Sequence, residues 1–187
     1  MTRAALLKVF LPVAAMLAMT SCAAPDDETW MQITGIAVAT GEDTTSTFTG
    51  SVIESDLQSG VTDTVDVEVQ NSTIILGDVG GGVFITVYHA AVEYHVQGYD
   101  FPSYQYTVTL FLPAPTSGEA GSADSKGVLE DLPLVPAALK SWILDPGNFP
   151  PEIAARGFTG EARVTLKGRT EEGRELEVSG SVTVVFN

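Results

Sequence analysis

Apolar and polar residues alternate along much of the chain, and this alternation predicts β-strands. In the segment 61–69, Val65, Val67 and Val69 share one parity, and mostly polar residues lie between them. This period of two is typical of a strand buried on one face only. The segment 104–112 repeats the pattern, so we expect a second half-buried strand there.

The long apolar run 83–96 contains a change of phase. Its first apolar residues share one parity and its last ones share the other: Val83, Ile85 and Val87, then Val92, Tyr94 and Val96. A slip of one residue turns every following side chain to the opposite face of a sheet. We therefore expect a bulge or a short turn at residues 89–91, which keeps both sets inside.

The C-terminal part predicts a long hairpin. Alternation over 162–167 and again over 176–186 flanks the turn sequence at 170–173. Two earlier strands are expected at 32–39 and 47–54.

The remaining segments predict connections rather than long helices. Residues 113–127 are rich in Pro, Gly, Ser and Ala, which predicts a mobile surface loop. Residues 133–144 fit one or two helical turns or an edge strand. With about six to eight short strands and no long amphipathic helix, the pattern predicts an all-β fold, an antiparallel β-sandwich, with residues 31–187 as a single domain.

The first thirty residues predict a lipoprotein signal. Basic residues precede an uncharged stretch that is shorter than the ~20 residues of a membrane-spanning helix, and small residues then lead to Cys22. This arrangement resembles the lipobox of bacterial lipoproteins, which implies removal of 1–21, acylation of Cys22 and a flexible tether over 22–30. The resemblance implies attachment to the membrane through lipid and, because Ala23 is not acidic, an outer-membrane location in a Gram-negative cell. The alternative is an ordinary cleaved signal with an incidental cysteine.

Composition excludes several classes of protein. The chain has 24 acidic and 9 basic side chains and a net charge of −15. It therefore lacks the basic face that a nucleic-acid partner requires. One cysteine cannot form a disulfide framework within the chain. A surface so acidic attracts cations or basic partners, or serves solubility alone.

Three stretches carry a resemblance to known proteins. They are the long run over 83–96, the proline-rich middle that ends in Leu139-Lys140, and the terminal pattern over 164–186. Together they resemble a group of uncharacterised bacterial lipoproteins whose domain is similar to immunoglobulin or fibronectin type III sandwiches. The resemblance covers about residues 45–187 and implies an immunoglobulin-like β-sandwich, and it carries over no functional residue.

Catalytic and metal-binding constellations are weak. His89, Glu93 and His95 share one parity, but four residues of regular strand separate the first two by about 13 Å, too far for one metal ion. Ser125 lies in a loop-like context without a nucleophile elbow. We therefore expect no enzyme, no metal site and no cofactor. Calcium remains an open alternative for acidic residues near strand ends: Asp63, Asp66, Asp78 and Glu42-Asp43.

Aromatic residues are concentrated in one region, because all five tyrosines lie between residues 88 and 106. Within it, Tyr99, Asp100, Phe101 and Tyr104 fall in or beside an expected loop and are the predicted ligand or partner surface. The alternative is that these rings belong to the core.

Two functions fit these patterns. The first is a non-catalytic, lipid-anchored interaction or assembly module that binds another envelope protein, which would expose a flat face or a free edge strand. The second is a binder of a small ligand, either a glycan or Ca²⁺, which would expose Tyr99 and Phe101 beside carboxylates in a concave site.

Overall fold

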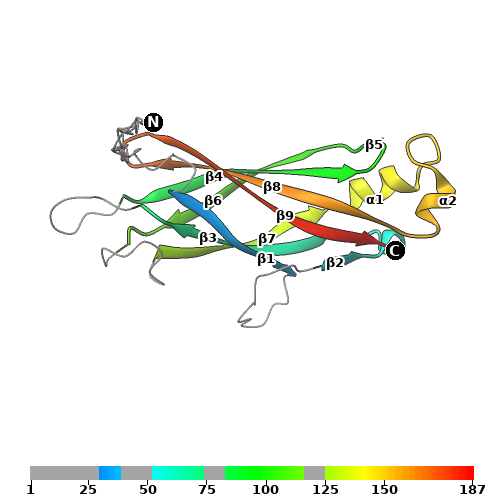
Figure 1. The fold of residues 1–187 in the computed structure, drawn as a ribbon, viewed down its shortest axis with the longest axis horizontal. Helices are drawn as coiled ribbons and strands as arrows, with labels where there is room; N and C mark the ends of the chain where they lie inside the picture. The colour runs from blue at the N-terminus through cyan, green and yellow to red at the C-terminus, as the bar shows by residue number, and fades with distance from the viewer. Residues whose placement is uncertain (1–29, 39–51, 74–82, 116–124) are drawn as a thin grey trace, which may run out of the picture.

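Two β-sheets pack face to face, with two short helices at one end of the molecule (Figure 1). The computed structural model describes residues 30–38, 52–73, 83–115 and 125–187. Within them, the predicted mainly-β, sandwich-like architecture is confirmed. The predictions that concern Cys22, the signal, the tether, Glu42-Asp43 and Asp78 lie outside the described residues.

The smaller sheet contains three strands in the order β1-β3-β7. Their bounds are β1 (Met31–Val38), β3 (Asp63–Asn71) and β7 (Lys126–Val135). Both pairings are antiparallel, and each contains a register shift.

The larger sheet contains six strands, in the order β2-β9-β8-β4-β5, with β6 also paired to β4. Their bounds are β2 (Val52–Ser55), β9 (Glu175–Phe186), β8 (Phe158–Thr170), β4 (Ile85–Val96), β5 (Tyr99–Asp100) and β6 (Tyr104–Leu112). Because β5 pairs with the end of β4 and β6 with its earlier part, β5 and β6 occupy the same edge of the sheet. The long C-terminal hairpin that the alternation predicts is the β8–β9 pair.

One strand corrects the prediction of a wholly antiparallel sandwich, because β2 runs parallel to β9. β1 pairs in the small sheet and β2 in the large one, so the chain crosses between the sheets. The ladder continues past β2, since the backbone N–H of Leu57 donates to the Asn187 carbonyl at 2.9 Å. Alternation shows which face of a strand is buried, but it does not determine the direction of its neighbour.

The predicted change of phase in the long strand is confirmed. In β4 the register shifts between Val87 and His89 against both neighbouring strands, slightly before the expected position. Val87 on one side and Ala90 on the other are both fully buried. The bulge therefore keeps both apolar sets inside the sandwich.

The expected loop 113–127 is too long, because Lys126 and Gly127 already belong to β7. β7 is a strand that the alternation of apolar and polar residues does not predict. Its alternation is interrupted at Asp131, where the backbone adopts a φ of 54°. The segment 133–144 contains both of the alternatives expected for it, since Pro133 lies at the end of β7 and Ala137–Leu144 forms helix α1.

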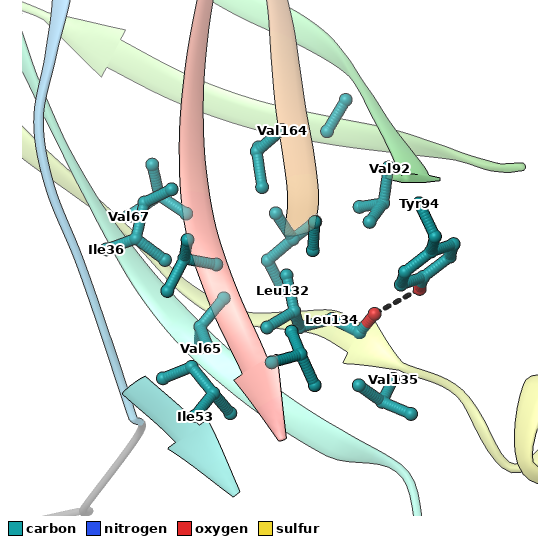
Figure 2. Packing of buried hydrophobic residues seen from close by; sticks show 14 of the residues in the cluster. Ile36, Ile53, Val65, Val67, Val92, Tyr94, Leu132, Leu134, Val135 and Val164 are labelled. Carbon is teal, nitrogen blue, oxygen red and sulfur yellow. Dashed lines mark hydrogen bonds between the residues drawn. The ribbon is translucent and has the colours of Figure 1, made fainter. Parts of the chain in front are cut away.

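Apolar side chains from both sheets meet in one core. Figure 2 shows Ile36, Val65 and Val67 of the small sheet facing the large sheet, from which Val92 and Val164 extend. A polar link joins the two layers, because the Tyr94 hydroxyl on β4 donates a hydrogen bond to the Leu134 carbonyl on β7 (Figure 2).

The helical end is fixed by a buried lysine. Lys140 of α1 is only 1% exposed. Its ammonium donates to the Asp56 carbonyl at 2.9 Å and to Ser59 Oγ at 2.9 Å. It also forms an ion pair with Asp63 of β3 at 3.0 Å. Since an unpaired buried charge is costly, these contacts tie α1 to the 3-10 turn Leu57–Ser59 (η2) and to the small sheet.

Candidate functional site

The predicted surface lies where β4 turns into β5. Tyr99 and Asp100 form β5 itself, and His95 pairs with Asp100 across the hairpin. Phe101 follows in a short connection, and Tyr104 begins β6. The structure therefore brings the four predicted residues to one end of the large sheet.

Most of the aromatic surface at this end is used for packing. Phe101 lies among four rings from α1, β8, β9 and the segment before α2, with centroid distances of 5.1 to 6.5 Å: Trp142, Phe149, Phe158 and Phe186. Tyr99 meets the edge of Phe149 at 4.8 Å. Tyr104 meets Tyr94 at 6.3 Å. We call this group the aromatic plug, because it closes the helical end of the sandwich.

A shallow polar groove of about 440 Å³ runs beside the plug and is lined by Glu93, His95, Asp100 and Phe101 among others. His95 pairs in register with Asp100 on one side and Glu161 on the other. In the described residues, no three His, Cys, Asp or Glu side chains are close enough together to hold a metal ion.

The described calcium candidates already have structural partners. Asp63 binds the Lys140 ammonium. Asp66 accepts a hydrogen bond from the backbone N–H of Asp131 at 3.0 Å. That hydrogen bond helps to hold the left-handed conformation of Asp131, an unusual one for a residue with a side chain. Ser125, considered above as a nucleophile, is fully buried just before β7.

The edge strand β6 is the first candidate for a partner-binding surface. On the described residues it pairs with β4 on one side and with no strand on the other. The segment 101–115 contains no charged residue. Its inward side chains remain half-buried over most of its length: Tyr104, Tyr106, Val108 and Leu110.

The other described edges are better protected against pairing. β2 has only four residues. β1 has a register shift between Ile33 and Gly35. β7 has a register shift, contains Pro133 and has Lys126, Glu130 and Asp131 exposed. Short length, bulges, proline and charge are the usual devices that prevent edge pairing. β6 shares a register shift with β4, but it has nine residues and contains neither charge nor proline.

A second feature lies on the outer face of the large sheet, at the end opposite the aromatic plug. Phe84, Tyr88 and Phe111 are 37%, 36% and 57% exposed. Together with Thr86 and Arg169 they line a groove of about 440 Å³, which we call the aromatic groove. The rings of Phe84 and Phe111 stack with centroids 5.2 Å apart.

Hydrogen bonds and charge fix the polar part of the aromatic groove. The Tyr88 hydroxyl donates to Glu175. Arg169 Nε donates to the same carboxylate at 2.8 Å, and its guanidinium lies 5.6 Å from the centre of the Tyr88 ring. The hydrogen bond to Glu175 raises the pKa of Tyr88. In return, the hydrogen bonds from Tyr88 and Arg169 lower the pKa of Glu175.

The concentration of aromatic residues in the sequence led to a predicted surface at the other end of the large sheet. The alternation of residues along the strands does contain a signal for the aromatic groove. Phe84 and Tyr88 alternate with the buried Ile85 and Val87, and Phe111 precedes the buried Leu112. Three large rings at outward positions therefore stand out from the polar residues that normally occupy such positions.

A scan against models of known protein families gave no match to this chain, and no curated protein matches it. No helix among the described residues is long and apolar enough to cross a membrane. What the molecule can bind must therefore be inferred from its own surfaces.

Proposed function

We propose that the protein is a non-catalytic, lipid-anchored interaction module of the bacterial cell envelope, and that a partner protein binds it by adding a strand to β6. The observation that carries this proposal is the edge of β6, which is unpaired in the described structure and has no charged residue. Strand addition uses backbone hydrogen bonds for affinity and alternate side chains for specificity.

The partly exposed inner side of β6 defines the chemistry of the partner. Tyr106, Val108 and Leu110 face the sandwich interior and are only half-buried. An added strand with apolar residues at alternate positions would cover them and complete the core at this edge. The outward positions Thr107 and Thr109 favour polar residues on the other side of the added strand.

The strand order supports an immunoglobulin-like fold for this module. In that fold, strands A, B and E share one sheet and strands C, F and G the other. β1, β3 and β7 correspond to the first set, and β4, β8 and β9 to the second. β6 then takes the place of the additional strand beside C that variable-type domains possess.

The lipid anchor gives the module its location. Cys22 lies eight residues before Trp30, the first described residue, and eight extended residues reach at most about 29 Å. An acylated Cys22 would therefore keep the domain close to a membrane, and the outer membrane is favoured in a Gram-negative cell. The acidic composition supports a protein partner and disfavours nucleic acid.

Site-specific photo-crosslinking in cells tests the proposal. A photoreactive residue at Thr107 or Thr109 of β6 should capture one envelope protein. The same residue at Thr159 or Thr183, exposed positions on the outer face of β8 and β9, is the matched control. The Cys22→Ala chain should lose the captured partner because it is released from the membrane.

A charged substitution on β6 provides a second test of strand addition. Val108→Lys should abolish capture, since an inward-pointing lysine on an edge strand opposes pairing. A thermal melt must show that this variant still folds. Equal capture from β6 and from the control positions, or unchanged capture by a folded Val108→Lys variant, would contradict strand addition.

A further inference from the structure

The aromatic groove departs from the pattern of the surrounding surface. At the other outward positions of β4, β6 and β8, away from the groove and the bulge, the side chains are polar or small: Ala91, Glu93, His95, Gln105, Thr107, Thr109, Thr159, Glu161, Arg163, Thr165 and Lys167. Only at the end near residues 84–88 do large rings replace them. Exposed apolar groups gathered at one place on an otherwise polar face mark a binding site.

We infer that the aromatic groove binds a neutral saccharide. Phe111 of the groove belongs to β6, but the groove uses its outward side chain and not the backbone edge, so the inference does not depend on the proposed strand addition. A sugar ring presents C–H groups on its faces and hydroxyl groups around its rim. It therefore needs an aromatic surface bordered by donors and acceptors.

The aromatic part of this requirement is met by Phe84, Phe111 and Tyr88. Phe84 and Phe111 stack on each other with an interplanar angle of 22°, which joins them into one apolar surface. Phe111 is the most exposed of the three. Aromatic side chains lose little conformational freedom on binding, so they are efficient contact residues.

The polar part is met by residues at the rim. Arg169 uses Nε and one terminal nitrogen on Glu175, at 2.8 and 2.7 Å, so other N–H groups of its five stay available for a ligand. Thr86 lies beside the rings and adds a hydroxyl, and Glu171 adds a carboxylate acceptor. Hydroxyl, guanidinium and carboxylate groups beside an apolar floor suit the hydroxyl groups of a saccharide.

The charges favour a neutral ligand over an ionic one. Arg169 is paired with Glu175, and Glu171 brings a further negative charge to the rim. An anionic ligand such as a phosphate would meet these carboxylates, and a cationic ligand would meet the guanidinium. The groove volume of about 440 Å³ lies within the usual range for small-ligand sites.

The site is also organised before a ligand arrives. Tyr88, Glu175 and Arg169 form a closed set of contacts, in which each group touches the other two. Side chains already fixed by their neighbours lose less entropy when a ligand binds.

Calorimetric titration of the full Cys22→Ser chain tests the inference. The probes are cellohexaose, maltohexaose, mannohexaose and chitohexaose, each to millimolar concentration, with glucose 6-phosphate as the anionic comparison. At least one hexasaccharide should bind, and the phosphate should not. Phe111→Ala and Arg169→Ala should each weaken that binding by about tenfold or more.

Val52→Ala on β2 is the matched control, because Val52 is 54% exposed and lies at the opposite edge of the sheet. It should bind the same saccharide unchanged. Absence of binding to all four hexasaccharides, or equal binding by Phe111→Ala, would overturn the inference. So would loss of the β6 crosslink in Phe111→Ala without any saccharide effect, since the groove would then belong to the protein interface.

Discussion

The two ends of the large sheet use aromatic residues in opposite ways. At one end, Phe101 is surrounded by rings from the helical segment and the C-terminal hairpin. At the other end, Phe84 and Phe111 touch each other and face outward. All three come from one stretch of about thirty residues, so the concentration of aromatic residues in the sequence does not distinguish the two ends. The difference is that α1 and the segment before α2 supply Trp142 and Phe149 to one end only.

This comparison shows that an aromatic cluster acquires its role from the elements that cover it. The aromatic plug should matter mainly for stability, and the aromatic groove mainly for binding. Substitution of one aromatic residue at each end can therefore distinguish a stabilising role from a binding role.

The largest expected effect is at the aromatic plug. Phe101→Ala should lower the free energy of unfolding by about 3 kcal/mol, because it removes a ring packed against five others. Phe111→Ala should cost no more than about 1 kcal/mol, the worth of its stacking with Phe84. Chemical denaturation of both variants measures the contrast. Equal losses would show that the two ends are covered alike.

Removing the buried positive charge of Lys140 should have the next largest effect on the free energy of unfolding. Lys140→Met keeps most of the side-chain volume but leaves Asp63 without its ion-pair partner, and the Asp56 carbonyl loses one of its donors. We expect a loss of about 2 to 3 kcal/mol. Denaturation followed by tryptophan fluorescence in a Trp30→Phe background reports on Trp142 of α1. Lys126→Met is the control, since its exposed ion pair with Glu68 is worth at most about 1 kcal/mol.

A smaller effect is expected from the hydrogen bond between the sheets. Tyr94→Phe keeps the ring and removes the hydroxyl that binds the Leu134 carbonyl. The loss should be about 1 to 2 kcal/mol, because the carbonyl is left buried without its donor. Hydrogen exchange of β7 amides should increase in the same variant. Unchanged exchange would mean that this link does not hold the two sheets together.

The smallest effect is expected at the aromatic groove. Tyr88→Phe removes the hydrogen bond that lowers the pKa of Glu175, so this pKa should rise towards its ordinary value. A lowered folded pKa gives stability that is present above the ordinary glutamate pKa and lost as the pH falls through the folded value. NMR titration of the carboxyl carbon measures the shift. Tyr104→Phe, at the other end of the sheet, should leave the Glu175 titration unchanged.

How much the sequence predicts depends on whether a feature is local. The β4 bulge and the β8–β9 hairpin can be recognised from the alternation of apolar and polar residues, and the structure contains both. β7 is missed because Asp131 and Pro133 break its alternation, while its partner β3 is about sixty residues away. The direction of β2 is also set by a distant strand.

The candidate site shows the same limit. The sequence identifies the aromatic stretch, but it cannot show that Trp142 and Phe149 return to cover Phe101. It also cannot show that β6 has no neighbour on its outer edge in the described structure. Parity alone does indicate that Phe84 and Tyr88 point outward, and this is the part of the aromatic groove that sequence reasoning can recover.

The division of the first two strands between the sheets has a mechanical consequence. The chain enters at Trp30, whose ring lies 4.2 Å from the Arg174 guanidinium in the β8–β9 turn. In the proposed lipid-anchored state, a pull through residues 22–30 would act first on this contact and on β1, whereas β2 is paired separately with β9. β1 also packs against β9, where Ile33 lies over Gly180, so loss of β1 would uncover part of the core while the β2–β9 pairing remains.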